Sequence, residues 1–145
     1  MKALVVYDSL YGNTAQLAEA IGAALAAESR VLRVRDAKPS DLGSFDLVIV
    51  GSPTQGGRAT DAMRAFLDRV PALDGAKVAA FDTRLRARWV KVFGYGAGKI
   101  AERMKSLGAT LVAEPEGFIV EGKEGPLAEG ELERAGAWAK DLRPD

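Results

Sequence analysis

The chain has 145 residues, 48% of them hydrophobic and 28% charged, which suits a single globular domain with a full core. Twenty basic residues balance twenty acidic ones, so no excess of positive charge favours nucleic acid as a partner. The chain contains no Cys and no His, which excludes disulfides, thiol nucleophiles and a Ser-His-Asp triad and removes the usual metal ligands. We therefore expect neither a catalytic side chain nor a metal site, and any redox chemistry must be carried by a bound cofactor.

The hydropathy of the chain favours a cytoplasmic protein with no membrane partner. No apolar run approaches the roughly 20 residues that span a bilayer. Residues 1–3 lead directly into an apolar stretch, so we expect no signal peptide. The oligomeric state does not follow from the sequence.

Apolar periodicity predicts alternating strands and helices in the first half of the chain. The predicted elements are a buried strand at 3–7, a helix at 13–28, an edge strand at 31–35, a loop with one helical turn at 39–43 and a buried strand at 47–50. The buried face of the helix is formed by residues at helical spacing, namely Leu17, Ala18, Ile21 and Leu25. The edge strand carries Arg33 and Arg35 on one side, which discourages pairing with another sheet.

The second half continues the alternation and ends in a helix. The predicted elements are a helix at 61–70, a strand at 77–81, a helix at 98–107 and a last strand at 110–120 that is interrupted near Pro115 and Gly117. The final helix has an inner stripe formed by Leu132, Ala135, Trp138, Ala139 and Leu142. Strands that alternate with helices imply an α/β fold in three layers, with a parallel sheet and helices on both of its faces. We expect residues 1–145 to form one domain.

A polar turn at residues 9–14 joins the first predicted strand to the first predicted helix. It places hydroxyl and N–H groups at the positive end of the helix dipole, an arrangement suited to a phosphate. The turn has no Lys, unlike the loops that bind nucleotide triphosphates, and it lacks the three spaced glycines of dinucleotide sites. It therefore indicates a site for the monophosphate of a mononucleotide.

The same stretch resembles the signature of the flavodoxin family. The positions that carry the resemblance are two aliphatic residues followed by Tyr7, Ser9, Gly12, Thr14, Ala18 and Ile21. The resemblance implies a doubly wound, five-stranded parallel sheet of order 2-1-3-4-5 with FMN as cofactor. In such a sheet the ligand lies beyond the carboxyl ends of the strands where the strand order reverses, a rule for which flavodoxin itself is a standard example.

Three loops would meet at that point, and the resemblance assigns a role to each. The first would hold the FMN phosphate through Ser9, Leu10, Tyr11, Gly12, Asn13 and Thr14. The second resembles the loop of flavodoxin-like reductases and would line the isoalloxazine ring through Pro53, Thr54, Gln55, Gly56 and Gly57. The third would meet the pyrimidine edge of the ring through Asp82 and Thr83, with Arg84 beside them and Trp89 or Tyr95 as the aromatic that stacks on the ring.

The chain departs from the flavodoxin pattern in its charge. Flavodoxins are usually strongly acidic, whereas this chain is neutral, and its third loop carries four cations, Arg84, Arg86, Arg88 and Lys91. These cations form either a solvated surface, a docking surface for an acidic redox partner or a grip on the phosphate of NADPH. Because positive charge stabilises an anionic reduced flavin, we expect the second one-electron reduction potential to be less negative than is usual in the family.

Three functions are compatible with these features. The first is an electron carrier that binds FMN and exchanges electrons with redox partner proteins. The second is a small FMN-dependent oxidoreductase of the NAD(P)H/quinone or protoporphyrinogen-oxidase type, which Tyr11 and the loop at 51–54 favour by resemblance. The third is a flavin-free interaction domain, since a fold does not fix a function.

Overall fold

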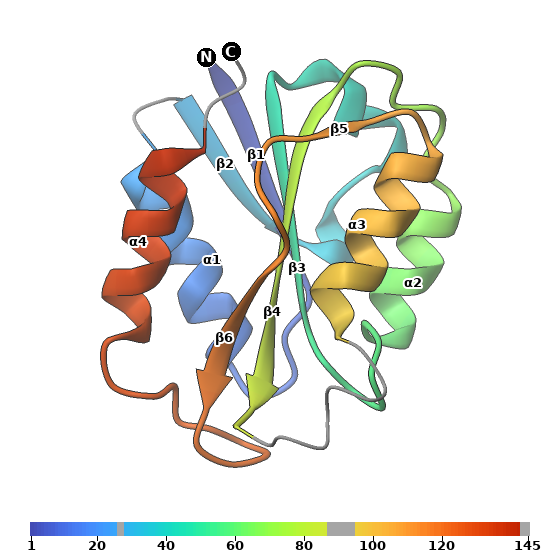
Figure 1. Ribbon diagram of the computed structural model, residues 1–145. Helices are drawn as coiled ribbons and strands as arrows, with labels where there is room; N and C mark the ends of the chain where they lie inside the picture. Colours follow the sequence, from blue (N-terminus) through green and yellow to red (C-terminus); the bar gives the residue numbers. More distant parts are fainter. Residues whose placement is uncertain (26–27, 87–94, 143–145) are drawn as a thin grey trace.

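The computed structural model describes residues 1–25, 28–86 and 95–142 and has a parallel sheet at its centre (Figure 1). Its strands are β1 (Lys2–Tyr7), β2 (Glu28–Arg33), β3 (Leu47–Pro53), β4 (Lys77–Leu85), β5 (Thr110–Leu111) and β6 (Glu116–Val120). Their order is β2-β1-β3-β4-β5, with β6 also paired to β4, and these pairings are parallel. The expected sheet of order 2-1-3-4-5 is confirmed.

Two short strands share the fifth position of the sheet. β5 pairs with the beginning of β4, where Thr110 lies opposite Lys77, and β6 pairs with its end, where Glu116 lies opposite Phe81. Pro115 lies between them and has no N–H to donate to a ladder, so the strand is broken there. The predicted interruption is confirmed at Pro115, whereas Gly117 lies within β6, where it pairs with Asp82.

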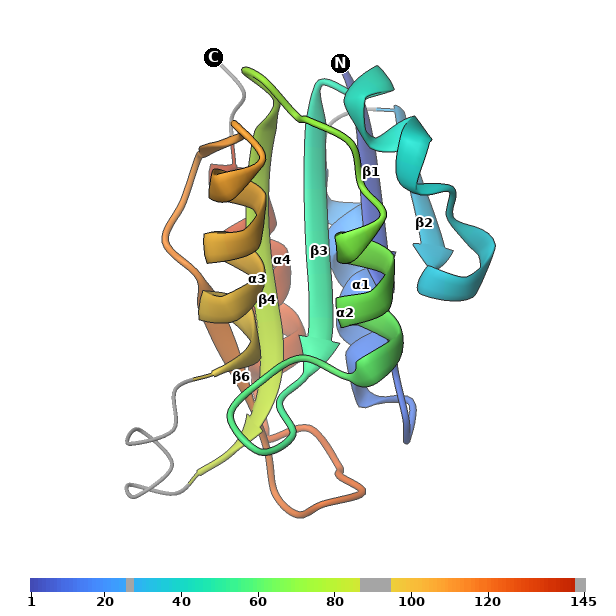
Figure 2. The same ribbon diagram turned by 90° about the vertical axis from the view of Figure 1, so that its right-hand side faces the viewer.

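Helices cover both faces of the sheet (Figures 1 and 2). One face carries α1 (Asn13–Ala24) and α4 (Glu131–Asp141), and the other carries α2 (Asp61–Asp68) and α3 (Gly96–Ser106). Two 3-10 turns, η1 (Val34–Asp36) and η2 (Pro39–Ser44), connect β2 to β3. The arrangement is the three-layer α/β architecture that the alternation of elements predicts.

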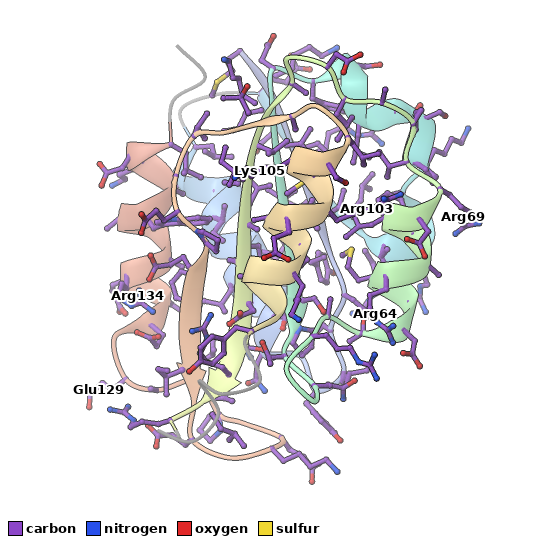
Figure 3. The ribbon with its side chains drawn as sticks, turned by 45° about the vertical axis from the view of Figure 1, so that its right-hand side comes forward. Arg64, Arg69, Arg103, Lys105, Glu129 and Arg134 are labelled. Atoms are coloured by element: carbon purple, nitrogen blue, oxygen red, sulfur yellow. The ribbon has the colours of Figure 1, made fainter. Side chains whose placement is uncertain are left out.

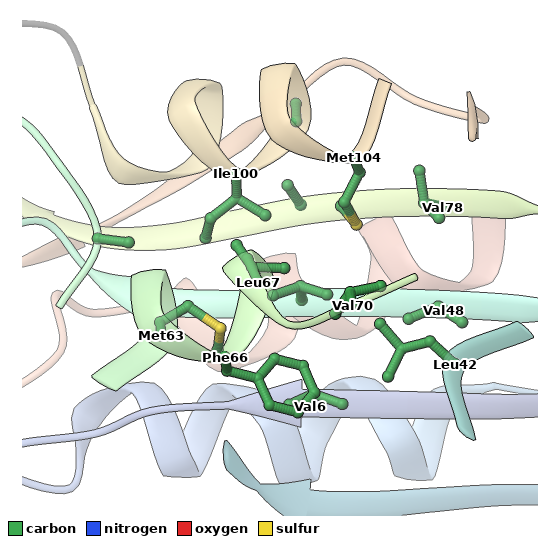
Figure 4. Packing of buried hydrophobic residues seen from close by; sticks show 14 of the residues in the cluster. Val6, Leu42, Val48, Met63, Phe66, Leu67, Val70, Val78, Ile100 and Met104 are labelled. Atoms are coloured by element: carbon green, nitrogen blue, oxygen red, sulfur yellow. The ribbon is translucent and has the colours of Figure 1, made fainter. Parts of the chain in front are cut away.

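An apolar cluster fills the space between the sheet and the helices α2 and α3 (Figure 4). The side chains of Met63 and Phe66 from α2 and of Ile100 and Met104 from α3 are almost completely buried. They pack over the small and branched residues of β3 and β4, and Val48 is one of these. Burial of this apolar surface is the main favourable contribution to folding.

A second cluster lies between the sheet and the helices α1 and α4. Phe81, Phe118 and Trp138 contact one another edge to face, with ring centroids 6.1–6.2 Å apart. A Cβ atom at Gly51 would lie 2.1 Å from the ring of Phe81, so β3 needs glycine at this position to lie beside that ring. The buried helix face that the sequence predicts for α1 also belongs to this cluster.

The structure corrects several of the predicted strand and helix boundaries, and β3 continues to Pro53 rather than ending at 50. α1 ends at Ala24 rather than at 28, because Glu28 already pairs with Lys2 at the start of β2. β2 ends at Arg33 rather than at 35, where the chain turns into η1. β4 continues to Leu85 rather than ending at 81, because β6 pairs with it along this extension.

The predicted inner stripe of the last helix is wrong at one position. Leu132 is 41% exposed, whereas Ala135, Ala139 and Leu142 are buried. Glu131 takes the inward position at this end of α4, because its carboxylate accepts a hydrogen bond from the Ile119 N–H at 2.7 Å. A buried polar partner thus replaces the apolar contact that the periodicity predicts.

Candidate functional site

A cleft of about 260 Å³ opens at the carboxyl ends of β1, β3 and β4, near the lower end of the molecule in Figure 1. Ten of the predicted cofactor-binding residues line it: Ser9, Leu10, Tyr11, Asn13, Thr14, Pro53, Thr54, Gln55, Thr83 and Arg84. Leu85, Val120 and Lys123 also line it, although the sequence analysis did not single them out. The three loops therefore meet in one place, as the topology predicts.

The other predicted site residues do not line this cleft. They are Gly12, Gly56, Gly57, Asp82 and Tyr95, which support the lining residues in ways described below. Trp89 lies outside the residues that the structure describes, and so do Arg88 and Lys91. Their expected roles stay predictions.

The hydroxyl group of Ser9 holds the first loop in shape. Its Oγ accepts hydrogen bonds from the N–H of Gly12 at 3.1 Å and from the N–H of Ala15 at 3.3 Å. Gly12 precedes α1 with a φ of 92°, a left-handed conformation that glycine adopts without strain. On the outer side, the guanidinium of Arg33 donates a hydrogen bond to the carbonyl of Ser9 at 3.0 Å. The loop is therefore held in place from both sides.

The first turn of α1 presents N–H groups to the cleft. Asn13 and Thr14 are buried and line the cleft, and within residues 1–25, 28–86 and 95–142 their backbone N–H groups have no hydrogen-bond acceptor. Such groups at a helix start carry the positive end of the helix dipole. Together with the Thr14 hydroxyl, they form a cradle that fits an anion such as a phosphate.

A buried network joins the first two loops beneath the cleft. The hydroxyl of Thr60 donates to a carboxylate oxygen of Asp8 at 2.5 Å and also accepts from the N–H of Met63, which caps α2. The N–H of Thr60 donates to the hydroxyl of Ser52 at 3.0 Å. Because Asp8, Ser52 and Thr60 are all buried, these bonds fix the positions of both loops.

The two glycines of the second loop form a tight turn rather than a wall of the cleft. Gln55 and Arg58 exchange backbone hydrogen bonds of 2.8 and 3.1 Å, and Gly56 and Gly57 between them have φ angles of 56° and 82°. Two consecutive positive φ angles are typical of the hairpin turn that favours glycine. The turn directs Thr54 and Gln55 toward the cleft.

Arg84 is held on three sides in the wall of the cleft. Its Nε and Nη2 atoms donate to the two carboxylate oxygens of Asp82, each at 2.7 Å. Its guanidinium lies 3.4 Å from the centre of the Tyr95 ring, and on another side it lies against Gly117, where a Cβ atom would come within 2.2 Å of it. Asp82 is completely buried and also accepts from the Ala97 N–H, so it anchors the start of α3 as well.

The cations near the cleft differ in how their charge is balanced. Arg84 is paired with Asp82, and Arg86 lies 3.7 Å from Glu121 in an exposed pair. Lys123 lines the cleft and forms no ion pair with the part of the chain that the structure describes. Within that part, Lys123 is therefore the cleft cation with the least compensated charge.

Arg134 fastens the last strand to the last helix. It forms ion pairs with Glu131 and Glu116, donates to the carbonyl of Gly117 and lies over the ring of Phe118. The hydrogen bond from Arg134 is the main cause that lowers the pKa of Glu131 below its ordinary value, while burial acts in the opposite direction. The hydrogen bond to Glu131 likewise raises the pKa of Arg134.

Two further observations limit the chemistry of the described residues. Within residues 1–25, 28–86 and 95–142, no group of three or more acidic side chains could hold a metal ion. No helix in these ranges has the length and apolar character needed to cross a membrane.

Comparison with known protein families identifies the family. The family model described as flavodoxin matches residues 5–138, which is most of the chain. The chain belongs to the flavodoxin family. FMN is the cofactor that this membership implies, and the N–H and hydroxyl donors at the start of α1 fit its phosphate.

The chain is similar to flavodoxins in both structure and sequence. A flavodoxin from the domain Archaea superposes with a TM-score of 0.81 at 27% identity and covers 98% of this chain and 96% of its own. The flavodoxin of Megasphaera elsdenii is 29% identical over an alignment of 118 residues, with a coverage of 74% of this chain and 80% of that protein.

A second group of relatives carries a different name. An NAD(P)H dehydrogenase (quinone) of Cupriavidus metallidurans is 36% identical over an alignment of 95 residues, with a coverage of 50% of this chain and 48% of that protein. The chain thus spans about half the length of the quinone dehydrogenases it matches.

Proposed function

We propose that this protein binds FMN in the cleft at the carboxyl ends of β1, β3 and β4 and carries electrons between redox partner proteins. The main support for the proposal is the start of α1, where the three loops meet. Asn13 and Thr14 are buried there, and their backbone N–H groups have no hydrogen-bond acceptor within the described part of the chain. The predicted cytoplasmic location stays a prediction.

The cradle at residues 9–14 would hold the phosphate of FMN. The donors are the N–H groups of Asn13 and Thr14 and the Thr14 hydroxyl, which lies 3.1 Å from the hydroxyl of Thr83. Ser9 would act by keeping the loop in shape through its bonds to Gly12 and Ala15. A doubly charged phosphate monoester suits such a site because helix N-terminal N–H groups stabilise negative charge.

The second and third loops would hold the flat ring system. Thr54, Gln55 and Thr83 offer polar groups at its edge, and Pro53 and Leu85 offer apolar surface. A cleft of about 260 Å³ is slightly smaller than the roughly 300–1,000 Å³ of most small-molecule sites, so part of the ring would stay exposed at its mouth. An exposed edge suits exchange of electrons with a protein partner, and FMN supplies the redox chemistry when bound.

Titration with FMN and with riboflavin, followed by quenching of flavin fluorescence, tests the proposal. Riboflavin lacks the phosphate, so we expect FMN to bind at least about tenfold more tightly. Equal affinity for the two flavins would contradict the phosphate site, and failure to bind either would favour the flavin-free interaction domain.

A second candidate function is an FMN-dependent oxidoreductase that acts on a quinone or a nicotinamide. The similarity to quinone dehydrogenases over half of this chain favours it, and so does Tyr11, a cleft-lining residue that is 46% exposed and through which the first loop resembles that of flavodoxin-like quinone reductases. Rapid loss of the visible flavin absorbance on addition of NADPH, followed by turnover with a quinone, would favour the enzyme over the carrier.

A further inference from the structure

A second groove of about 270 Å³ lies between α2 and α3, on the face of the sheet that these helices cover. It is lined by Ala59, Arg64, Leu67, Asp68, Lys99, Ile100 and Arg103. Figure 3 shows Arg103 on the side of α3 that is turned toward α2, with Lys105 on the opposite side of the same helix. None of these residues lines the cofactor cleft, and the charged ones among them do not belong to the apolar core.

The groove has an apolar floor and a positively charged rim. Ala59, Leu67 and Ile100 form the floor and are almost completely buried. The rim carries three cations, Arg64, Lys99 and Arg103. Arg64 forms an ion pair with Asp61, and Asp68 lies near Arg103, so the three cations face two carboxylates. The whole chain has no net charge, so the remaining excess of positive charge is a local feature.

One donor of the rim lacks an acceptor. The Nε atom of Arg103 is buried and makes no hydrogen bond within the described part of the chain. The nearest carboxylate oxygen, on Asp68, lies 3.9 Å away, beyond hydrogen-bond distance. The Arg103 side chain as a whole is 41% exposed, so a carboxylate supplied by another molecule can reach the outer part of its guanidinium.

The groove adjoins the cofactor cleft. Thr54 and Gln55 line the cleft, while Ala59, a few residues further along the same loop, lines the groove. The first turn of α3 touches both, since a Cβ atom at Gly96 would lie 3.2 Å from the Thr54 hydroxyl and 3.4 Å from the Ala59 nitrogen. A molecule seated in the groove would therefore lie beside the cleft.

We propose that the groove between α2 and α3 docks an acidic segment of the electron-transfer partner, with carboxylates on the cationic rim and an aliphatic side chain on the apolar floor. The identity of the partner as a redox protein rests on the proposed function. Charge complementarity favours an acidic partner. Because the rim cations stand on two separate helices, the groove suits a peptide segment that lies along it.

A fluorescein-labelled peptide of three Glu-Glu-Leu-Glu repeats tests the groove through fluorescence anisotropy. A peptide of three Lys-Lys-Leu-Lys repeats serves as the charge control. We expect saturable binding of the acidic peptide alone, weakening as salt is raised. The variants Arg103→Glu and Lys99→Glu should each weaken binding about fivefold or more, because each reverses one rim charge.

The matched control is Lys105→Glu, which makes the same change of charge on the same helix outside the groove. It should leave the affinity for the peptide within about twofold. Equal weakening by Lys105→Glu and Arg103→Glu, or no saturable binding to the unaltered protein, would overturn the proposal. Displacement of the peptide by NADPH would overturn it in favour of a nucleotide site.

FMN titration of the same variants separates this proposal from the proposed function. We expect unchanged FMN affinity in all three variants. FMN binding without peptide binding would overturn the docking groove alone. Peptide binding at the groove without FMN binding would overturn the proposed function and still support the groove as a docking site.

Discussion

Arg84 and Asp82 form a two-point ion pair on one strand, with both guanidinium-to-carboxylate distances at 2.7 Å. The two residues are neighbours on the same face of β4, because side chains two positions apart on a strand point the same way. Pairing with a buried carboxylate offsets the charge of Arg84. The expected effect of the third-loop cations on the flavin therefore depends less on Arg84 than the sequence alone indicates.

We expect Asp82→Asn to destabilise the protein by about 2–3 kcal/mol, because it leaves a guanidinium without its carboxylate and weakens the contact to α3. Urea unfolding monitored by circular dichroism measures this loss. The control is Asp61→Asn, which alters an exposed ion pair with Arg64 and should cost much less. Similar losses in the two variants would contradict the structural role of the Asp82 pair.

Gly117→Ala tests whether the guanidinium of Arg84 needs its place against β6. The new methyl group would lie 2.2 Å from that guanidinium and would displace it from Asp82 and Tyr95. We expect a loss of about 1–3 kcal/mol in stability and weaker FMN binding. Gly98→Ala, on α3, has no atom within 4 Å of the added Cβ and should be neutral or stabilising.

Lys123 should influence the flavin more than Arg84 does, because its charge is the less compensated one in the described part of the cleft. We expect Lys123→Gln to make the second one-electron reduction potential of bound FMN more negative by tens of millivolts. Redox titration of the FMN-loaded protein measures it. Lys105→Gln, far from the cleft, is the control, and equal potentials in all three proteins would rule out the effect.

Thr14→Val should weaken FMN binding by roughly tenfold, because valine keeps the shape of threonine but cannot donate to the phosphate. Riboflavin affinity should change little, since riboflavin has no phosphate to contact. Fluorescence titration with both flavins gives the two constants. A parallel loss for riboflavin would show that the variant disturbs the loop as a whole, for instance through the contact to Thr83.

Glu131→Gln should destabilise the protein by about 1–2 kcal/mol at neutral pH through its weaker bonds to Arg134 and to the Ile119 N–H. The pKa of Glu131 is lowered in the folded protein, so its carboxylate contributes fully to stability above pH 4.5. This contribution is lost as the pH falls through the pKa of the folded state.

The stability difference between the wild type and Glu131→Gln should therefore shrink below pH 4.5. Thermal unfolding at a series of pH values checks this dependence. Glu133→Gln, an exposed neighbour in the same helical turn, should show no comparable trend. A constant difference across the acid range would argue against the assigned role of Arg134.

The features that local sequence determines were predictable. Strand, turn and helix follow one another within residues 3–24, so the phosphate loop and its place at the start of α1 could be read from apolar spacing and the polar turn. The strand order came from the family resemblance, because residue spacing does not fix which strands are neighbours.

The features that depend on distant pairing were not predictable. Lys123 and Val120 reach the cleft because β6 pairs with the end of β4, a register that no local pattern contains. For the same reason the sequence analysis predicts Asp82 and Arg84 in a loop. In the structure, pairing with β6 extends β4 through both residues. The inward position of Glu131 likewise depends on an N–H group of β6.

The break between β5 and β6 has a consequence for association between molecules. An open sheet edge exposes a row of unpaired backbone groups that a strand from another chain can extend. At the edge formed by β5 and β6, these backbone groups fall into one segment of two residues and one of five, with Pro115 between them. A strand from another molecule could therefore pair only with short segments of this edge. Weaker pairing between molecules favours solubility at high concentration.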